Sequence, residues 1–467
     1  MIQLRHQQPS LWGGFWAEEV AELWEPWMRA ADQLLDDEAL LDAIYEAQGK
    51  RRKHSRTLGR KQTPAEVVLR LLILKHARNW SFEVLEREVR ANLIYRDFTR
   101  LGTEKVPDAK VLAKIAKVLG PEVVQELHQR IVELAQEAKL VWGRKMRVDT
   151  TVVETPIHYP TDSSLLGDGA RVLTRLIKQV SQKVGGVAER VRDRMRSVKK
   201  KVVAIAVSSR RKGPEGDEQR KGLYRQLLSL TRKVRNQARR VCAEVSNLSR
   251  RKQVAAQPLT EKMQTMIERV GQVIRQTKAR ILMGNTKAPG KLASVFEAHT
   301  EIIRKGKASK PTEFGKLVKV QEAENQIITD YEIYDERPND SDLLVEAVEK
   351  HEKCFGRTPV MVAADAGFYS SANEKKLEEK GVQRVSVPNR NTRSEARRQK
   401  QKQRWFKRGQ RWRTGCEGRI SVLKRRHGLN RSRYRGPEGI QLWVGLGIIA
   451  DNLISMGNLM AMRGAKA

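Results

Sequence analysis

Cysteine is scarce in this sequence, with three residues among 467 that stand far apart. Cys242, Cys354 and Cys416 are odd in number and match no metal-ligand spacing. No cluster of histidine and cysteine offers a site for a soft metal ion either. We therefore expect a reducing compartment and no disulfide framework, and any bound metal would need oxygen ligands.

Long apolar runs are also missing. The most apolar stretch, LWVGLGIIA from Leu442, ends after nine residues at Asp451, which is too short to span a bilayer. Four glutamates stand among the tryptophans of the first thirty residues, which is unlike a signal peptide. The sequence therefore predicts a buried C-terminal helix, no membrane partner and a cytoplasmic protein.

Acidic residues are outnumbered, because 55 Asp and Glu stand against 91 Lys and Arg and leave a formal net charge of +36. Hydrophobic residues still make up 39% of the chain, so a folded core is possible. A positive excess of this size predicts a polyanionic partner, of which nucleic acid is the commonest. Residues 171–310 hold 36 of the cations and only 10 acids. We interpret them as a surface for the DNA backbone, since a solvated coiled coil would be more balanced.

The hydrophobic period changes along the chain and predicts four parts. Residues 1–140 have the helical period, with a capping box at Thr63–Glu66, and fit either a helix-turn-helix-like DNA-binding domain or a plain helical scaffold. Residues 141–164 contain the alternating segment KMRVDTTVVETP, which is typical of a strand. Residues 165–295 predict two or three packed helices in a basic insertion, and residues 296–467 return to strands.

The last part fixes the expected fold class. A hairpin is predicted at KLVKVQEAENQIITDYEIYD, followed by a helix from Ser341 to Glu352 and a short apolar strand that ends at Asp365. Helices are predicted from about Thr414 to His427 and at the C-terminus. An isolated strand, a hairpin and a crossover helix before a further strand predict an α/β (mixed α+β) fold, with a mixed sheet flanked by helices.

Two carboxylates belong to these strands, where burial is costly unless the charge is paired. Asp149 lies within the alternating strand, and Asp365 ends the apolar one. Each alone has a plainer interpretation, a salt bridge from Asp149 to Arg147 and a turn formed by Asp365 ahead of Gly367. If the strands are neighbours, the two carboxylates repel each other unless a divalent cation lies between them, and Mg²⁺ fits oxygen ligands.

A third carboxylate stands alone in the basic segment RWRTGCEGRISVLKRRHGLNRSRYRG. On a helix, Arg413, Glu417 and Lys424 share one face. A neighbouring stripe can face a core and consists of Cys416, Ile420, Leu423 and His427. His427 either ends that core stripe or touches phosphate. Such a helix is buried on one side and directs a carboxylate and two cations towards a site.

Three carboxylates among many cations suit phosphodiester chemistry. Two metal ions held by the acids can activate the attacking oxygen and stabilise the leaving one, while Arg and Lys hold neighbouring phosphates. No proton-donating carboxylic acid is needed, in contrast to glycosidase chemistry.

The chain resembles a known family, the DDE-type transposases of bacterial insertion sequences, whose catalytic domain is ribonuclease-H-like. The segments TPAEVVLRLLILKHARNWSFEVLEREVRANLIYRDFTRLG and VPDAKVLAKI are similar to the N-terminal helical domain of these enzymes. The aspartate segments of the family are matched by RVDTTVVETPIHYPTDSSLL and ADAGFYSSANEKKLEEKG, and the glutamate helix by GCEGRISVLKRRHGL. The family's third motif is Tyr, two residues, Arg, three residues, Glu, six residues, Lys. Arg413, Glu417 and Lys424 fit it, but Gln410 replaces the tyrosine.

The resemblance implies that Asp149, Asp365 and Glu417 are catalytic and bind two Mg²⁺ ions, with Mn²⁺ tolerated. Water would cut a strand at the ends of the element, and the freed 3′-hydroxyl would attack target DNA. The implied partners are double-stranded DNA, as terminal inverted repeats and target, and further copies of the chain in a dimeric or larger synaptic complex. The implied location is the bacterial cytoplasm, at the nucleoid.

The same resemblance assigns roles to the predicted parts. Residues 141–164 and 296–467 would form the catalytic domain, while residues 1–140 and 165–295 would bind DNA. The residues expected to contact DNA are Arg404, Trp405, Lys407, Arg408, Trp412, Arg413, Lys424, Arg425 and Arg426. For the two tryptophans, a core or backbone-stacking role is the plainer alternative to receiving a flipped base.

Two other functions use the same residues. A regulator derived from a transposase would bind DNA without cutting it, but it gives no reason to keep three acids. A metal-dependent nuclease would hydrolyse DNA without strand transfer, and the sequence does not separate it from a transposase because both use the same metal site.

Overall fold

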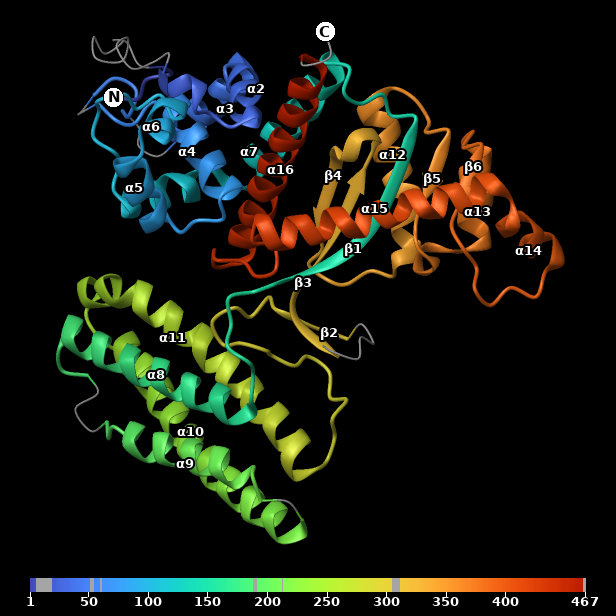
Figure 1. Cartoon of the computed structure of the whole chain (residues 1–467). Coiled ribbons are helices and arrows are strands. Elements are labelled where there is room, and N and C mark those ends of the chain that lie inside the picture. The colour runs from blue at the N-terminus through green and yellow to red at the C-terminus, as the bar shows by residue number, and fades with distance from the viewer. Residues whose placement is uncertain are drawn as a thin grey trace. The chain divides into compact units, whose positions relative to one another are not determined.

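The computed structural model describes residues 1–5, 19–50, 54–58, 61–187, 191–211, 213–304 and 311–464 (Figure 1). The chain divides into two compact units. The first combines Met1–Pro156 with Gly315–Ala467, and the second is Ile157–Phe314. The predicted insertion boundaries at residues 165 and 295 both lie inside the second unit.

The N-terminal region of the first unit is helical. Its helices are α2 (Pro26–Leu35), α3 (Glu38–Gly49), α4 (Ala65–Ala77), α5 (Phe82–Ala91), α6 (Leu93–Phe98) and α7 (Ala109–Glu137). Asp37 and Ser81 cap α3 and α5 by accepting the backbone N–H groups of Leu40 and Val84. Helix α7 contains a break at Gly120, whose φ is 75°, so it consists of two helical halves.

The capping box predicted at Thr63–Glu66 is wrong. Helix α4 begins one residue later, and Pro64 precedes it with no side-chain cap. Glu66 lies instead near two guanidinium groups, 3.7 Å from Arg70 and 3.6 Å from Arg100. An ion-pair cluster therefore takes the place of the local cap.

The C-terminal helix α16 (Pro437–Gly464) shares one core with the N-terminal helices. Leu442, Leu446 and Ile449 pack in the same cluster as residues of α2, α4 and α7. By length and composition α16 could cross a membrane, but 67% of its apolar window is buried inside the protein. The predicted buried C-terminal helix is confirmed.

A six-stranded sheet has the order β2-β3-β1-β5-β6, with β4 paired to β3. Its strands are β1 (Lys145–Glu154), β2 (Glu301–Arg304), β3 (Thr312–Glu322), β4 (Ile328–Ile333), β5 (Met361–Ala363) and β6 (Arg384–Ser386). Strand β1 is antiparallel to β3 and parallel to β5, and β5 is parallel to β6. Strands β3 and β4 form the predicted hairpin, so the expected mixed sheet is confirmed.

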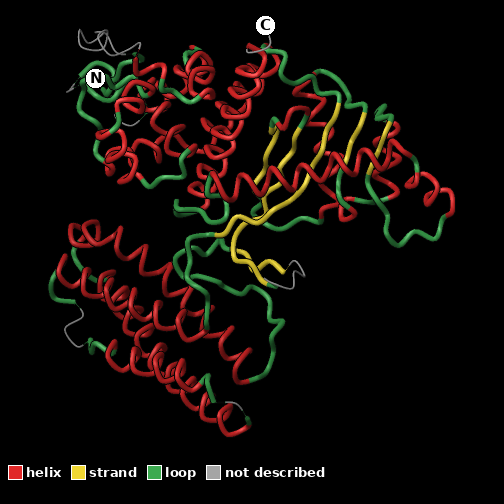
Figure 2. The backbone as a smooth tube through the Cα atoms, in the orientation of Figure 1, coloured by secondary structure: helices red, strands yellow, loops and turns green. Residues whose placement is uncertain are grey.

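Helices cover both faces of the sheet (Figure 2). Alternation along β1 explains the division, because Met146 and Val148 pack with α12 (Leu343–Phe355) and α13 (Ser371–Glu379), whereas Val153 packs with α15 (Arg404–Arg426) and α16. The short helix α14 (Glu395–Lys402) precedes α15. Helix α15 is longer than predicted, beginning ten residues before Thr414.

The second unit is a bundle of helices with its own core. Its long helices are α8 (Asp162–Val184), α9 (Met195–Ser208), α10 (Pro214–Ser246) and α11 (Arg250–Thr277). Thr161 and Ser164 form a capping box at the start of α8. The apolar stripe predicted on α10 is buried at Leu227, Val234 and Val241. The part of the chain that the structure describes thus has four long helices here, where two or three were expected.

Candidate active site

Asp149 belongs to the face of β1 that α15 covers. Its side chain is 14% exposed, and one carboxylate oxygen accepts the N–H of Thr150 at 2.7 Å. Arg147, two residues earlier on the same face, is buried and forms an ion pair with Glu322 at 2.5 Å. The salt bridge considered from sequence between Asp149 and Arg147 is therefore replaced by a pairing across strands β1 and β3.

Asp365 is brought beside Asp149 by the parallel pairing of β1 and β5. The register pairs Arg147 of β1 with Ala363 of β5. Two residues further along each segment, the same register brings Asp149 opposite Asp365. Neighbouring strands lie about 4.8 Å apart. Asp365 also forms the turn considered from sequence, because its carboxylate accepts the N–H of Gly367 at 2.8 Å.

Glu417 reaches the site from α15, which packs across β1, β5 and β6. Its side chain is 57% exposed and forms an ion pair with Arg413 at 2.9 Å. The other amino group of Arg413 is 3.6 Å from Asp149. Arg413 therefore lies between the first and third carboxylates, as the spacing along the helix predicts.

The charges of the other two acids act on Asp149. Burial and the negative charges of Asp365 and Glu417 together raise the pKa of Asp149 to about 6, although the Thr150 N–H and Arg413 act in the opposite direction. The donors are all oxygen atoms, and a buried carboxylate repelled by two others is stabilised by a divalent cation. This donor set fits Mg²⁺, although among the described residues no three His, Cys, Asp or Glu side chains are already gathered around one point.

Gln410 occupies the position of the family's tyrosine and contacts the ends of two strands. Its amide nitrogen donates to the carbonyl of Ser386 at 2.5 Å and to that of Ala364 at 3.3 Å. Gly409 permits this approach, because a Cβ atom there would lie 2.6 Å from Ser386 Oγ. Gln410 therefore holds the residue that precedes Asp365 against α15.

A buried ion-pair network fixes the other end of α15. Asp451 of α16 receives two hydrogen bonds from Arg419, at 2.8 and 2.9 Å, and lies 3.3 Å from His427. His427 is 1% exposed and its other ring nitrogen contacts the carbonyl of His76 at 3.1 Å. His427 thus ends the core stripe, the first of its two expected roles.

The residues expected to contact DNA differ in exposure. Arg404, Lys407, Arg408, Arg425 and Arg426 are exposed, whereas Trp405, Trp412, Arg413 and Lys424 are partly buried. Trp412 is stacked by the guanidinium of Arg147 at 4.9 Å, and its carbonyl accepts a hydrogen bond from the same group. Trp405 contacts the ring of Phe406. The rings of Trp405 and Trp412 are thus each in contact with another side chain of the protein.

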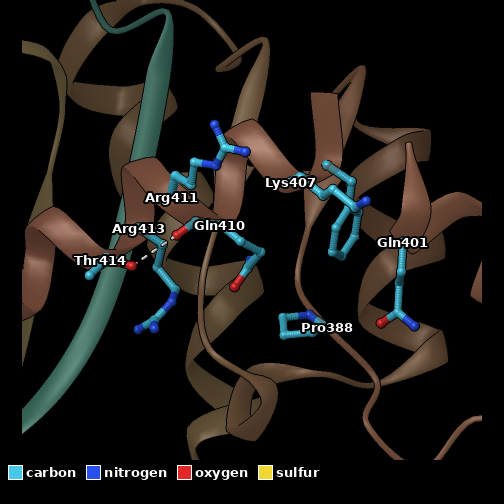
Figure 3. Close-up of a pocket in the computed structure, with 8 residues that line it drawn as sticks. Pro388, Gln401, Lys407, Gln410, Arg411, Arg413 and Thr414 are labelled. Atoms are coloured by element: carbon cyan, nitrogen blue, oxygen red, sulfur yellow. Dashed lines mark hydrogen bonds between the residues drawn. The ribbon is translucent and has the colours of Figure 1, made fainter. Parts of the chain in front are cut away.

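Two cavities flank Glu417 along α15. The larger, of about 580 Å³, is shown in Figure 3 and is lined by Pro388, Gln401, Phe406, Lys407, Gln410, Arg411, Arg413 and Thr414. The smaller, of about 440 Å³, is lined by Asn79, Pro156, Lys424, Arg425, Gly428, Asn430, Arg431, Ser432 and Arg433. Neither lining includes an acid, and both include several cations.

A further carboxylate, Asp340, lies near the site and is not among the predicted site residues. Asp340 accepts a hydrogen bond from the Thr150 hydroxyl at 3.1 Å. A Cβ atom on Gly367 would lie 3.2 Å from Asp340 and 3.1 Å from Asp365, so the two carboxylates flank that glycine. The signal in the sequence was weak, because Asp340 belongs to the polar turn ahead of α12, where acids are common.

Two family models match the chain. The model described as "Transposase DDE domain" covers residues 293–453, which include Asp365 and Glu417. The model described as "Transposase domain (DUF772)" covers residues 26–117, the N-terminal helices. No curated protein and no solved structure matches the chain. Together with the mixed sheet and its flanking helices, these matches show that the chain belongs to the DDE transposases of insertion sequences and that its sheet domain is ribonuclease-H-like.

Proposed function

We propose that this transposase binds the terminal inverted repeats of its insertion sequence and cuts and transfers DNA strands at Asp149, Asp365 and Glu417. The observation that carries the proposal is the placement of these acids: Asp149 lies within β1, Asp365 follows the neighbouring parallel strand β5, and Glu417 lies on the helix that crosses both strands.

The acids would hold two Mg²⁺ ions, which would supply Lewis-acid activation of the attacking and leaving oxygens when bound. Arg413 bridges Asp149 and Glu417. Once cations neutralise these acids, the guanidinium is free to bind a phosphate, for which its planar fork is suited. Mn²⁺ has similar ligand preferences and would substitute.

DNA would follow α15. The two acid-free cavities lie on either side of Glu417 along this helix, and their cations would hold phosphates. Figure 3 shows Gln410 and Arg413 in the lining of the larger cavity. The N-terminal helices and the basic bundle would bind the element's ends in a synaptic complex of two or more copies at the nucleoid.

Isosteric substitutions test the catalytic proposal. Asp149→Asn, Asp365→Asn and Glu417→Gln keep the shape of each side chain and remove its charge. We expect each to lower Mg²⁺-dependent cleavage of an end-bearing plasmid by at least about a thousandfold, while DNA binding in EDTA is retained. Cleavage at the wild-type rate by any variant would exclude that carboxylate from the site.

The products separate the remaining functions. Strand transfer gives target DNA covalently joined to an element end, whereas a nuclease gives only cut ends. A wild-type protein that binds ends but neither cuts nor joins them under Mg²⁺ or Mn²⁺ would be a regulator. We expect joined products, and their absence alongside efficient cutting would favour the nuclease.

A further inference from the structure

Helix α10 contains a long segment without acids. No Asp or Glu occurs from residue 219 to residue 243, whereas eight cations do. They are Arg220, Lys221, Arg225, Arg232, Lys233, Arg235, Arg239 and Arg240. The cations at the start of the segment are paired, since Arg220 and Arg225 bind Asp217 and Glu218. The later ones lie beyond reach of those acids along the helix.

Arg235 is held in the groove between α10 and α11. Its Nε donates to the carbonyl of Ile267 at 3.0 Å. The guanidinium rests over Gly271, where a Cβ atom would lie 2.7 Å from Nη2. The side chain is thus half-buried and oriented by α11, and its terminal amino groups remain available to a ligand.

Two further arginines flank this guanidinium. Arg239 follows Arg235 by one turn on α10, and Arg275 follows Gly271 by one turn on α11, so each lies about 6 Å further along its helix. Because α10 and α11 form an antiparallel hairpin, these turns lead in opposite directions from Arg235. Arg239 and Arg275 are exposed. The three arginines therefore form a row along the groove.

The row is electrostatically uncompensated. Burial lowers the pKa of Arg235, and the charges of Arg239 and Arg275 lower it further. Across the described ranges, no carboxylate lies within 4.0 Å of any of the three side chains, in contrast to Arg220 and Arg225. Like charges held together on a folded surface are relieved by a bound anion.

We propose that Arg235, Arg239 and Arg275 bind successive phosphates of a DNA strand. A row of guanidinium groups fits a polyanion better than a single anion, and contacts to phosphates are independent of base sequence. The inference rests on the proposed function for the identity of the polyanion. It adds a binding row that belongs wholly to the helical bundle and contains none of the catalytic residues.

Salt dependence of binding tests the row. Affinity of the full-length protein for a duplex of arbitrary sequence is measured by fluorescence anisotropy in EDTA over a range of KCl concentrations. Each lost phosphate contact lowers the slope of log K against log salt by about 0.9. We expect the triple variant R235Q/R239Q/R275Q to lose between about 2 and 3 from that slope.

A charge-matched control uses the paired cations. The variant R220Q/K221Q/R225Q removes the same formal charge from the same helical bundle, but its residues lie beside Asp217 and Glu218. We expect its slope to equal that of the wild type. An equal loss of salt slope in both triple variants would mean that only the net charge affects binding. That result would overturn the proposal that the three arginines bind phosphates.

Gly271→Ala tests the geometry while keeping every charge. The added methyl group displaces the Arg235 guanidinium, a flexible end, and favours the helix, so the melting temperature is expected to be unchanged or higher. We expect the slope to fall by about 0.9. If both this variant and R235Q/R239Q/R275Q keep the wild-type salt slope, the proposal that the three arginines bind phosphates is overturned. Loss of Mg²⁺-dependent cleavage is measured separately, so failure of the catalytic proposal leaves this result interpretable.

Discussion

Gln410 carries out a positioning role at the residue where the family has a tyrosine. Its amide contacts the carbonyls of Ala364 and Ser386, at the ends of β5 and β6. The residue that it restrains directly precedes Asp365. The departure from the motif therefore changes how the second aspartate is held without removing any charge from the site.

Replacing Gln410 with leucine should misplace Asp365. We expect the cleavage rate to fall ten- to a hundredfold, since small displacements of a catalytic group have effects of this order, and the Mg²⁺ concentration for half-maximal cleavage to rise. Gln401→Leu is the matched control, because Gln401 lines the same cavity but its hydrogen bonds within the described residues are to the backbone of Asn389. A rise in the Mg²⁺ midpoint in the control as well would contradict the positioning role.

Lys75 is a buried base whose titration is expected to affect stability. Its side chain is 1% exposed, and its ammonium lies 4.7 to 4.9 Å from the ring centres of Phe82, Tyr434 and Trp443. Burial lowers the pKa of Lys75 to about 7 from 10.5. Between these values the unfolded chain binds more protons than the folded one, so stability rises with pH.

The unfolding free energy of the wild type should therefore increase between about pH 7.5 and about pH 9, relative to Lys75→Met. The expected gain is about 2 kcal/mol, because one pKa unit corresponds to about 1.4 kcal/mol. Urea unfolding of both proteins at the two pH values measures it. Parallel pH profiles would show that the aromatic rings keep Lys75 charged and that its pKa is not lowered.

At the scale of elements, α15 is the helix on which the site depends, and α16 holds it in place. Asp451 is the acid at which the apolar run of the sequence ends. In the fold its carboxylate binds Arg419, which lies two residues after Glu417 on α15. Removing one partner of a buried ion pair leaves an uncompensated charge, at a cost of roughly 3–5 kcal/mol.

Asp451→Leu should accordingly destabilise the protein by that amount, as measured by denaturant unfolding. The double variant Asp451→Leu with Arg419→Met removes both charges and should recover most of the loss. His427, the other neighbour of Asp451, is unchanged in both proteins. If the double variant is no more stable than Asp451→Leu alone, the destabilisation comes from packing in α16 and not from the unpaired arginine.

The hydrophobic period and the spacing of residues in the sequence predicted several of these elements. Alternation identified β1, the apolar run before Asp365 identified β5, and helical spacing placed Arg413 and Glu417 on one face. Local pattern did not predict partners distant in the chain. The pairing of Arg147 with Glu322 spans 175 residues, and the contact of Gln410 with Ser386 depends on the order of parallel strands. Such contacts follow from topology, which one sequence does not specify.

For the whole molecule, charge and connectivity separate the two units. Residues 157–314 contain 36 of the 91 Lys and Arg and 13 of the 55 acids, so most of the positive excess belongs to the helical bundle. The chain leaves the sheet after β1 and returns through β3, where Glu154 and Gly315 are paired. The points of exit and return are neighbours, and each unit has its own core.

This connectivity predicts that the first unit folds without the second. A short glycine-rich linker that joins Pro156 to Gly315 removes the bundle. The linker spans only the short distance between the neighbouring strands β1 and β3, where Glu154 and Gly315 are paired. We expect a cooperatively unfolding protein that loses β2 but retains β1, β3 from Gly315 onward, β4 to β6 and the helices on both faces of the sheet. Circular dichroism and thermal melting measure this. A molten or aggregated product would show that the bundle is needed for folding.

The same deletion separates catalysis from end binding. The three carboxylates, Arg413 and both acid-free cavities remain in the deletion variant, so Mn²⁺-dependent nicking of plasmid at low salt should persist. Its affinity for duplex DNA should be weaker and its salt slope smaller, because the bundle's phosphate contacts are gone. The opposite result would be a deletion variant that no longer nicks plasmid but still binds DNA with a salt dependence like that of the wild type. That result would place the DNA-binding surface on the first unit and would show that the active site requires the bundle.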